Sequence, residues 1–201
     1  MMNLAAVFDR VPKFVLFGAA GLIQIGLIGL MVVDRVAILR TGAEITLRTR
    51  PLDPRDFLRG DYMALSYDIS SVPADALKDE RSAGQGTPVF VKLAPNRDGF
   101  HEAISVHAAP VDVVSPEVLI RGRVVSGTDC GKDGRTFCGI LQVHYGIERY
   151  FVPEEEGTRS WVESARNQRK LTVVAAVVPT GRAAIKRLLI DGEPVYDEPW
   201  Y

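Results

Sequence analysis

The stretch FVLFGAAGLIQIGLIGLMVV, residues 14–33, decides the overall organisation of this chain. It holds twenty residues without a charge, and Gln24 is its one strongly polar side chain. A helix of about 20 apolar residues is long enough to cross a hydrocarbon core of roughly 30 Å. The sequence therefore predicts a short tail at 1–13, a transmembrane helix at 14–33 and one domain at 34–201.

A cleaved signal peptide is the alternative interpretation of this run. The apolar core of a signal peptide is about 7–15 residues long and is followed by a small-x-small cleavage site. Here the run is longer, and the sequence at its end, MVVDRVAILR, offers no clear site of that kind. These features favour an uncleaved anchor.

Two cysteines bear on the orientation of the anchor, which the flanking basic residues leave nearly balanced. Those residues are Arg10 and Lys13 before the run, and Arg35 and Arg40 after it. Cys130 and Cys138 enclose GKDGRTF, in which Asp133-Gly134 is typical of a hairpin turn. Cysteines on either side of such a turn are near enough to bond, and disulfides persist outside the reducing cytosol. The sequence therefore predicts a Cys130–Cys138 disulfide and a cytoplasmic tail at 1–13. Two reduced cysteines in a cytosolic loop are the alternative.

The domain at 34–201 is predicted to be mainly β. Ile45, Leu47 and Thr49 alternate with polar residues and stop at Pro51, as in a half-exposed strand. Further strands are expected at 62–69, 88–94, 100–107, 118–126, 137–145, 148–152, 171–178 and 183–190, and short helices at 73–82 and 154–170. The expected fold class is β-rich α+β, in which an antiparallel sheet curls into a barrel or sandwich with one or two short helices.

Charge and motifs exclude several functions. Without Asp9, Arg10 and Lys13, residues 34–201 keep 22 basic and 24 acidic residues, a net charge of −2, which argues against a nucleic-acid partner. A P-loop, a G-x-S-x-G elbow, an H-E-x-x-H pair and a dinucleotide fingerprint are absent from the sequence. The histidines do not have zinc-ligand spacing with the two cysteines. We therefore expect no cofactor and no metal.

A second stretch, FLRGDYMALSY at residues 57–67, carries a recognisable pattern. Gly60-Asp61-Tyr62, Leu65 and Tyr67 match the letters GDYXXLXY, and the later segment YGIERYFVPEEEG, residues 145–157, resembles a second recurring block. On these residues the chain resembles the GDYXXLXY family of membrane-anchored bacterial proteins, a family without an assigned activity. The resemblance implies an inner-membrane protein with a periplasmic domain, often encoded beside a multipass membrane protein.

The motif has two interpretations. In the structural one, which we favour, Gly60 and Asp61 build a turn, Leu65 packs inward, and the tyrosines bury their rings while their hydroxyls find partners. In the functional one, the two blocks form a binding surface. The candidate binding residues are then Arg59, Gly60, Asp61, Tyr62, Leu65, Tyr67, Tyr145, Glu148, Arg149 and Tyr150.

An enzyme is the alternative to a binding domain. The order of the motifs, with Lys92 after the Gly-Asp pair, is similar to the β-domain of type I signal peptidases, which use a serine nucleophile and a lysine base. That serine is missing here, because the corresponding region, 49–54, offers only Thr49. We therefore expect no enzyme and no catalytic residue. A hydrolase with a site around Asp61, Lys92 and His144 stays open, as does calcium bound by the aspartates at 53, 56 and 61. The favoured prediction is a periplasmic interaction domain, an accessory subunit of a multipass membrane protein.

Overall fold

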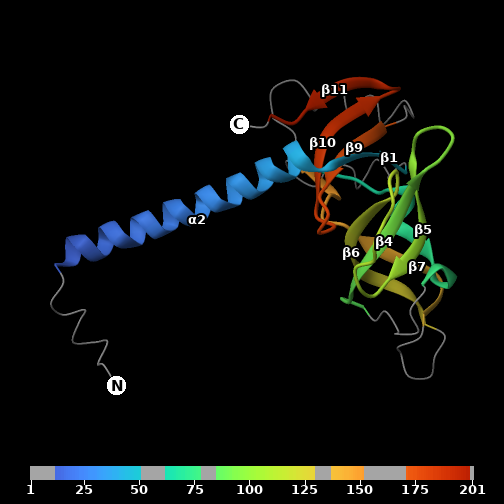
Figure 1. Ribbon diagram of the computed structural model, residues 1–201, viewed down its shortest axis with the longest axis horizontal. Helices are drawn as coiled ribbons and strands as arrows, with labels where there is room; N and C mark the ends of the chain where they lie inside the picture. Colours follow the sequence, from blue (N-terminus) through green and yellow to red (C-terminus); the bar gives the residue numbers. More distant parts are fainter. Residues whose placement is uncertain (1–11, 51–61, 78–84, 130–136, 152–170, 200–201) are drawn as a thin grey trace. The chain divides into compact units, whose positions relative to one another are not determined.

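The helix α2, Lys13–Thr41, opens the described part of the chain (Figure 1). The computed structural model describes residues 12–50, 62–77, 85–129, 137–151 and 171–199. It divides into the unit Met1–Ala37 and the unit Ile38–Tyr201. The helix extends beyond the predicted 14–33 because residues 34–41 contain neither proline nor glycine, and it ends at Thr41, directly before Gly42.

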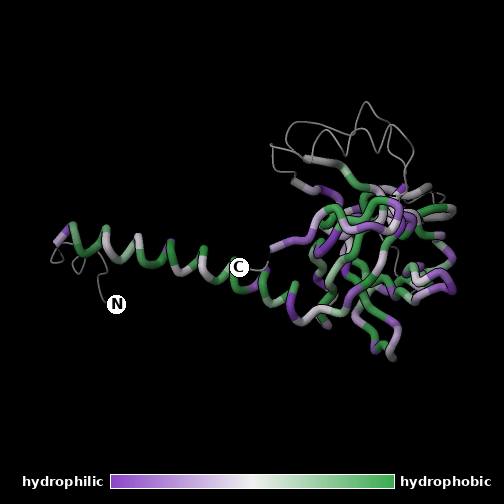
Figure 2. The backbone as a smooth tube through the Cα atoms, turned by 90° about the horizontal axis from the view of Figure 1, so that it is seen from above, coloured by the Kyte–Doolittle hydropathy of each residue, from purple (hydrophilic) through white to green (hydrophobic). Residues whose placement is uncertain are grey.

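The composition of α2 suits a lipid environment. Its mean hydropathy reaches 2.2, and by length and composition it can cross a membrane. Its large apolar side chains, such as Phe17, Leu22 and Met31, are exposed. Figure 2 shows this apolar character along the helix. An N-terminal apolar helix of this kind is compatible with a single-span anchor.

The rest of the described chain forms three antiparallel sheets. The four-stranded sheet has the order β1 (Ala43–Arg48), β9 (Leu171–Val177), β10 (Ala183–Ile190), β11 (Glu193–Asp197). The five-stranded sheet has the order β3 (Ser71–Pro73), β7 (Phe137–His144), β6 (Val118–Asp129), β4 (Pro88–Pro95), β5 (His101–His107). The two-stranded sheet pairs β2 (Tyr62–Ala64) with β8 (Arg149–Phe151).

The core lies between these sheets and follows from the alternation of the strands. On β4 the side chains of Val89, Val91 and Leu93 are buried, while those between them are partly exposed. They pack in one cluster with residues of the four-stranded sheet, including Leu47 and Leu188. The predicted fold class is confirmed, because an N-terminal apolar helix is followed by antiparallel sheets, one of them nearly barrel-shaped.

Hydrogen bonds join one sheet to the next. The amide of Arg121 on β6 donates to the carbonyl oxygen of Gly181 in the turn after β9 (2.8 Å). The amide of Thr46 on β1 donates to Nδ1 of His101 on β5 (3.2 Å). An isolated antiparallel bridge connects Thr49 with Tyr67. The end of β1 is thereby tied to the segment that carries the GDYXXLXY pattern.

The last turn of α2 belongs to the β-rich unit. Ile38 and Leu39 are buried against Ala176 of β9 and Ala184 of β10, whose small side chains leave room for them. Gly42 then turns the chain into β1. A Cβ on Gly42 would lie 2.7 Å from the Ile38 carbonyl oxygen and 2.8 Å from the Val177 nitrogen. Glycine is required there because both neighbours are backbone atoms.

One of the two expected helices differs from the structure, and the other lies outside the described residues. Of the helix expected at 73–82, the described part contains the end of β3 and one 3-10 turn, η2 (Ala74–Ala76). The strand expected at 62–69 is shorter in the structure, because β2 ends at Ala64 and a second 3-10 turn, η1, occupies Asp68–Ser70. The expected helix at 154–170 lies outside the described residues. The strands β3 and β11 were not predicted.

Candidate functional site

The two sequence blocks singled out above are partners in space. Strand β2, which starts at Tyr62 of the GDYXXLXY pattern, pairs antiparallel with β8 of the second block. Tyr62 is opposite Phe151, and Ala64 is opposite Arg149. The Leu65 amide continues the pairing by donating to the carbonyl oxygen of Glu148 (2.8 Å). The blocks thus form one structural unit although 77 residues, 68–144, separate them.

Two tyrosines connect the blocks by reciprocal hydrogen bonds. The hydroxyl of Tyr67 donates to the carbonyl oxygen of Ile147 (2.6 Å). The hydroxyl of Tyr145 donates to the carbonyl oxygen of Ile69 (2.6 Å). Each tyrosine therefore satisfies a backbone acceptor beside the other, and both rings are buried. We call this arrangement the tyrosine clamp, made of Tyr67, Tyr145 and these two carbonyl groups.

Electrostatics keeps both clamp hydroxyls protonated. Burial raises the pKa of Tyr67 well above its ordinary value, and the Glu148 carboxylate adds to this effect. Burial and the same carboxylate also raise the pKa of Tyr145. Loss of the proton from either phenol would bury a charge, so both are weaker acids than an exposed tyrosine. The clamp is suited to holding structure.

Glu148 supports the turn between β7 and β8. Its carboxylate accepts hydrogen bonds from the amides of Tyr145 and Gly146, the latter at 2.9 Å. Gly146 has φ 81°, a left-handed conformation that suits glycine. The turn separates β7 from β8, which correspond to the strands expected at 137–145 and 148–152. After this turn Tyr150 is buried, and its ring meets that of Tyr196 edge to face, with centroids 5.3 Å apart.

The ten candidate binding residues differ in how far they are exposed to solvent. Leu65, Tyr67, Tyr145 and Tyr150 are buried, Glu148 is partly exposed, and Arg149 is exposed on β8. Tyr62 contributes its backbone to β2. Arg59, Gly60 and Asp61 lie outside the described residues. In the described part of the pattern, Leu65 and Tyr67 pack in the core, and the Tyr67 hydroxyl forms a hydrogen bond within the domain.

Lys92 and His144, the two described residues of the hydrolase alternative, do not come together. Lys92 forms an ion pair with Glu117 (2.6 Å), whose pKa is lowered by this lysine. Lys92 is opposite Leu119 on β6, whereas His144 is opposite Arg123. Four positions along β6 and two strand spacings separate them, on the order of 16 Å. Asp61 lies outside the described residues.

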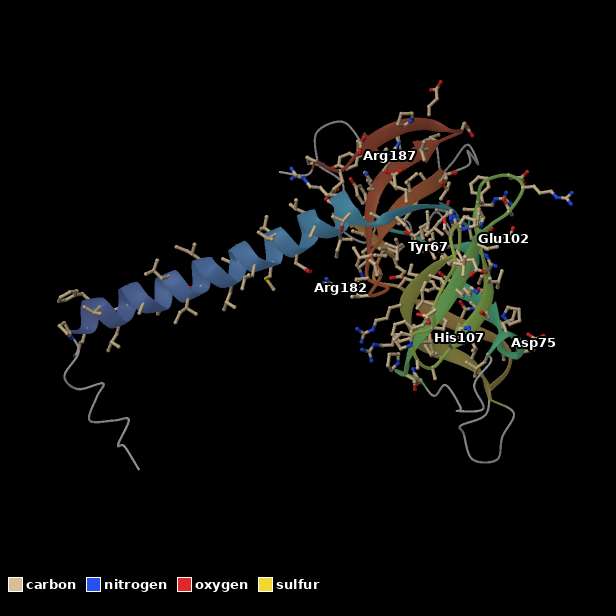
Figure 3. All side chains as sticks on the ribbon, in the orientation of Figure 1. Tyr67, Asp75, Glu102, His107, Arg182 and Arg187 are labelled. Carbon is tan, nitrogen blue, oxygen red and sulfur yellow. The ribbon has the colours of Figure 1, made fainter. Side chains whose placement is uncertain are left out.

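A serine–histidine contact was missed in the sequence. Ser105 Oγ lies 2.9 Å from His107 Nε2 on β5, and Ser105 is opposite Lys92 in the strand register. The spacing of two residues on one strand places both side chains on the same face, which is the signal that could have found them. Figure 3 labels His107 on this strand. The contact can polarise the serine hydroxyl.

The described residues contain no group of three or more histidine, cysteine or carboxylate side chains that could bind a metal ion. The aspartates of the calcium alternative, at 53, 56 and 61, lie outside them.

Of the two cysteines of the predicted disulfide, the structure describes the backbone of Cys138 but not Cys130. Strands β6 and β7 form the expected hairpin, in which Thr128 is opposite Cys138 and Asp129 is opposite Phe137. Cys130 follows Asp129 and lies outside the described residues.

Comparison with known proteins gives one match. The protein-family model described as "GDYXXLXY protein" matches residues 24–188, which is most of the 201-residue chain. No curated protein and no solved structure matches the chain. The matched range includes much of α2, the tyrosine clamp and strands β1 to β9. The chain therefore belongs to the GDYXXLXY protein family.

Proposed function

We propose that this protein is a single-span protein of a bacterial inner membrane whose β-rich domain lies in the periplasm. The domain acts without catalysis as an interaction module, and it serves as an accessory subunit of a multipass membrane protein. The observation that carries this proposal is the apolar helix α2, 29 residues long, whose last turn is built into the domain.

The connection between helix and domain supports a subunit that works at the membrane. Ile38 and Leu39 are buried on β9 and β10, and Gly42 leads directly into β1. A flexible linker is therefore absent between residue 38 and β1. Such a domain stays within reach of the membrane surface and of the extracytoplasmic loops of a membrane partner.

The apolar helix offers a second contact for that partner. Gly18, Gly21, Gly26 and Gly29 have open space where a Cβ would be. Small residues let another transmembrane helix approach closely, which is how helices associate in lipid. The proposed complex therefore uses both α2 and the domain.

Crosslinking in intact membranes tests this proposal. The full chain, carrying an affinity tag, is crosslinked in cells, purified in detergent, and its neighbours are identified by mass spectrometry. We expect a multipass membrane protein. A variant in which 14–33 is replaced by an unrelated apolar helix of equal length serves as the matched control and is expected to lose part of this recovery. Recovery of no multipass protein by the intact chain contradicts the proposal.

The periplasmic location has its own test. We propose that Cys130 and Cys138 form a disulfide across the β6–β7 hairpin, a bond that persists outside the cytosol. In intact cells, a thiol reagent that does not cross the inner membrane is expected to label both cysteines only after reduction. Labelling without reduction, or from the cytosolic side alone, contradicts this location.

A hydrolase is the second candidate, and the Ser105–His107 contact is the observation in its favour. In that case Ser105 Oγ attacks a fluorophosphonate probe at phosphorus, fluoride leaves, and His107 accepts the hydroxyl proton. The hydrolase hypothesis predicts an adduct on Ser105 that disappears in Ser105→Ala and slows in His107→Gln. Our favoured proposal predicts no adduct on Ser105.

A further inference from the structure

Three arginines gather where the β9–β10 turn meets β6. A Cβ on Gly181, which has φ 82°, would lie 2.9 Å from Cβ of Arg121, so glycine allows the turn to press against β6. Arg182 follows Gly181 directly, and Arg123 lies two residues after Arg121 on the same strand face. Figure 3 labels Arg182. All three side chains are exposed, and we call them the arginine patch.

Among the described residues, carboxylates do not neutralise the β6 part of this patch. Within the described ranges, neither Arg121 nor Arg123 has a carboxylate at ion-pair distance, and Arg123 donates to the carbonyl oxygen of Gly86 (2.6 Å). The register places Phe90 opposite Arg121 and His144 opposite Arg123, so neither facing strand supplies an acid. Other cations of the domain do have such partners. These pairs are Arg50–Asp68, Lys92–Glu117, Lys186–Glu44 and Arg187–Glu44.

The same turn is joined to the residues that follow the apolar run. Val178 packs against the cluster of Ile38 and Leu39. Ile38 comes five residues after Val33, where the apolar run ends. Both residues lie in α2, where five residues rise about 7.5 Å along the helix. The polar headgroup layer adds roughly 5–8 Å on each side of the hydrocarbon core. With 14–33 in the membrane, the β9–β10 turn is therefore within reach of the headgroups.

We propose that the arginine patch binds anionic phospholipid headgroups of the membrane that holds the chain's own helix. This inference rests on the proposed membrane anchoring. A guanidinium group matches a phosphate with two parallel hydrogen bonds, and an anionic lipid surface attracts each basic side chain near it. The binding holds the β-rich domain in a defined orientation on the membrane.

Chemical modification of arginine tests the patch in the full chain. The protein is reconstituted in nanodiscs of phosphatidylcholine alone or with added phosphatidylglycerol, and phenylglyoxal modification is followed at each arginine by mass spectrometry. We expect modification of the patch to slow about fivefold in the anionic discs. The difference is expected to vanish at about 1 M salt, where the Debye length is about 3 Å. Arg97, exposed in the β4–β5 turn, serves as the internal control.

A charge variant separates this patch from a general surface effect. Arg121→Gln with Arg123→Gln is expected to weaken the lipid-dependent protection of Arg182, while Arg97→Gln leaves it unchanged. Equal modification rates in both kinds of disc, or equal slowing at Arg97, overturn the proposal. Alkaline carbonate extraction of matching vesicles checks the anchor separately. If the chain stays embedded and the arginine modification rates are equal in both kinds of disc, only the lipid-binding proposal is contradicted. Release of the chain contradicts both that proposal and the membrane anchoring.

Discussion

The hydroxyls of Tyr67 and Tyr145 form reciprocal hydrogen bonds between two segments of the chain, around 65–69 and 145–147. Tyr67 donates to Ile147, and Tyr145 donates to Ile69, each at 2.6 Å. Both acceptors are backbone carbonyl groups in buried segments, so each phenol supplies a partner that β-sheet pairing does not. The pattern Leu65-x-Tyr67 is thereby explained as part of the core rather than as an exposed recognition sequence.

Removal of either hydroxyl is expected to destabilise the domain. Tyr67→Phe and Tyr145→Phe each leave a buried carbonyl group without its donor, which costs about 1–3 kcal/mol of unfolding free energy. Thermal or urea unfolding of the detergent-solubilised chain, followed by circular dichroism, measures this cost. Tyr196→Phe, in a ring that is only partly buried, is the control and is expected to cost less. Wild-type stability in both clamp variants would contradict the role of the clamp.

Gly42 is expected to tolerate no side chain. In Gly42→Ala the new Cβ meets the backbone of Ile38 and Val177, so the end of α2 or strand β9 must shift. Overpacking of this kind costs about 1–3 kcal/mol. Gly26→Ala, with open space around its Cβ, is the matched control and should leave the unfolding temperature unchanged or raised. Equal unfolding temperatures for the two variants would show that the turn into β1 is not tightly packed.

His101 is expected to make stability depend on pH. Burial of the ring lowers the pKa of His101 from 6.5. Between the folded pKa and 6.5, the unfolded chain binds the proton and the folded chain does not, so stability falls as the pH drops below about 6.5. His101→Gln is expected to flatten this part of the curve of unfolding free energy against pH.

The acidic limb of that curve has a different origin. Hydrogen bonding by Lys186 lowers the pKa of Glu44, and hydrogen bonding by Lys92 lowers that of Glu117. Stability from these lowered values is present above the unfolded pKa of 4.5 and is lost as the pH falls below it. For His101, the contradicting result is a wild-type unfolding free energy that stays constant between pH 7 and pH 5.

The strands were predictable where local patterns are strong. Alternation over β4, with Val89, Val91 and Leu93 inward, marks a half-buried strand, and Pro179-Thr180-Gly181 marks the turn between β9 and β10. Strand β3 has three residues and β11 contains Pro194, so neither has enough alternation to be recognised. The expected burial of Tyr67 and its need for a hydroxyl partner were also accessible from the sequence.

The partners across the clamp were not predictable. Ile147 lies eighty positions from Tyr67, and nothing local to either residue specifies that contact. The turn at Gly146 breaks the strand period, so Tyr145 and Tyr150 are both buried although an unbroken strand would place them on opposite faces. The arginine patch depends on the meeting of β6 with the turn after β9, a tertiary contact that net charge does not reveal.

The intact mass of the mature protein, measured after alkaline carbonate extraction of bacterial membranes, tests membrane anchoring most directly. Retention in the membrane pellet with a mass that includes 14–33 is the predicted result. A released protein whose first residue lies after Val33 would contradict the anchor, and with it the proposed membrane partner.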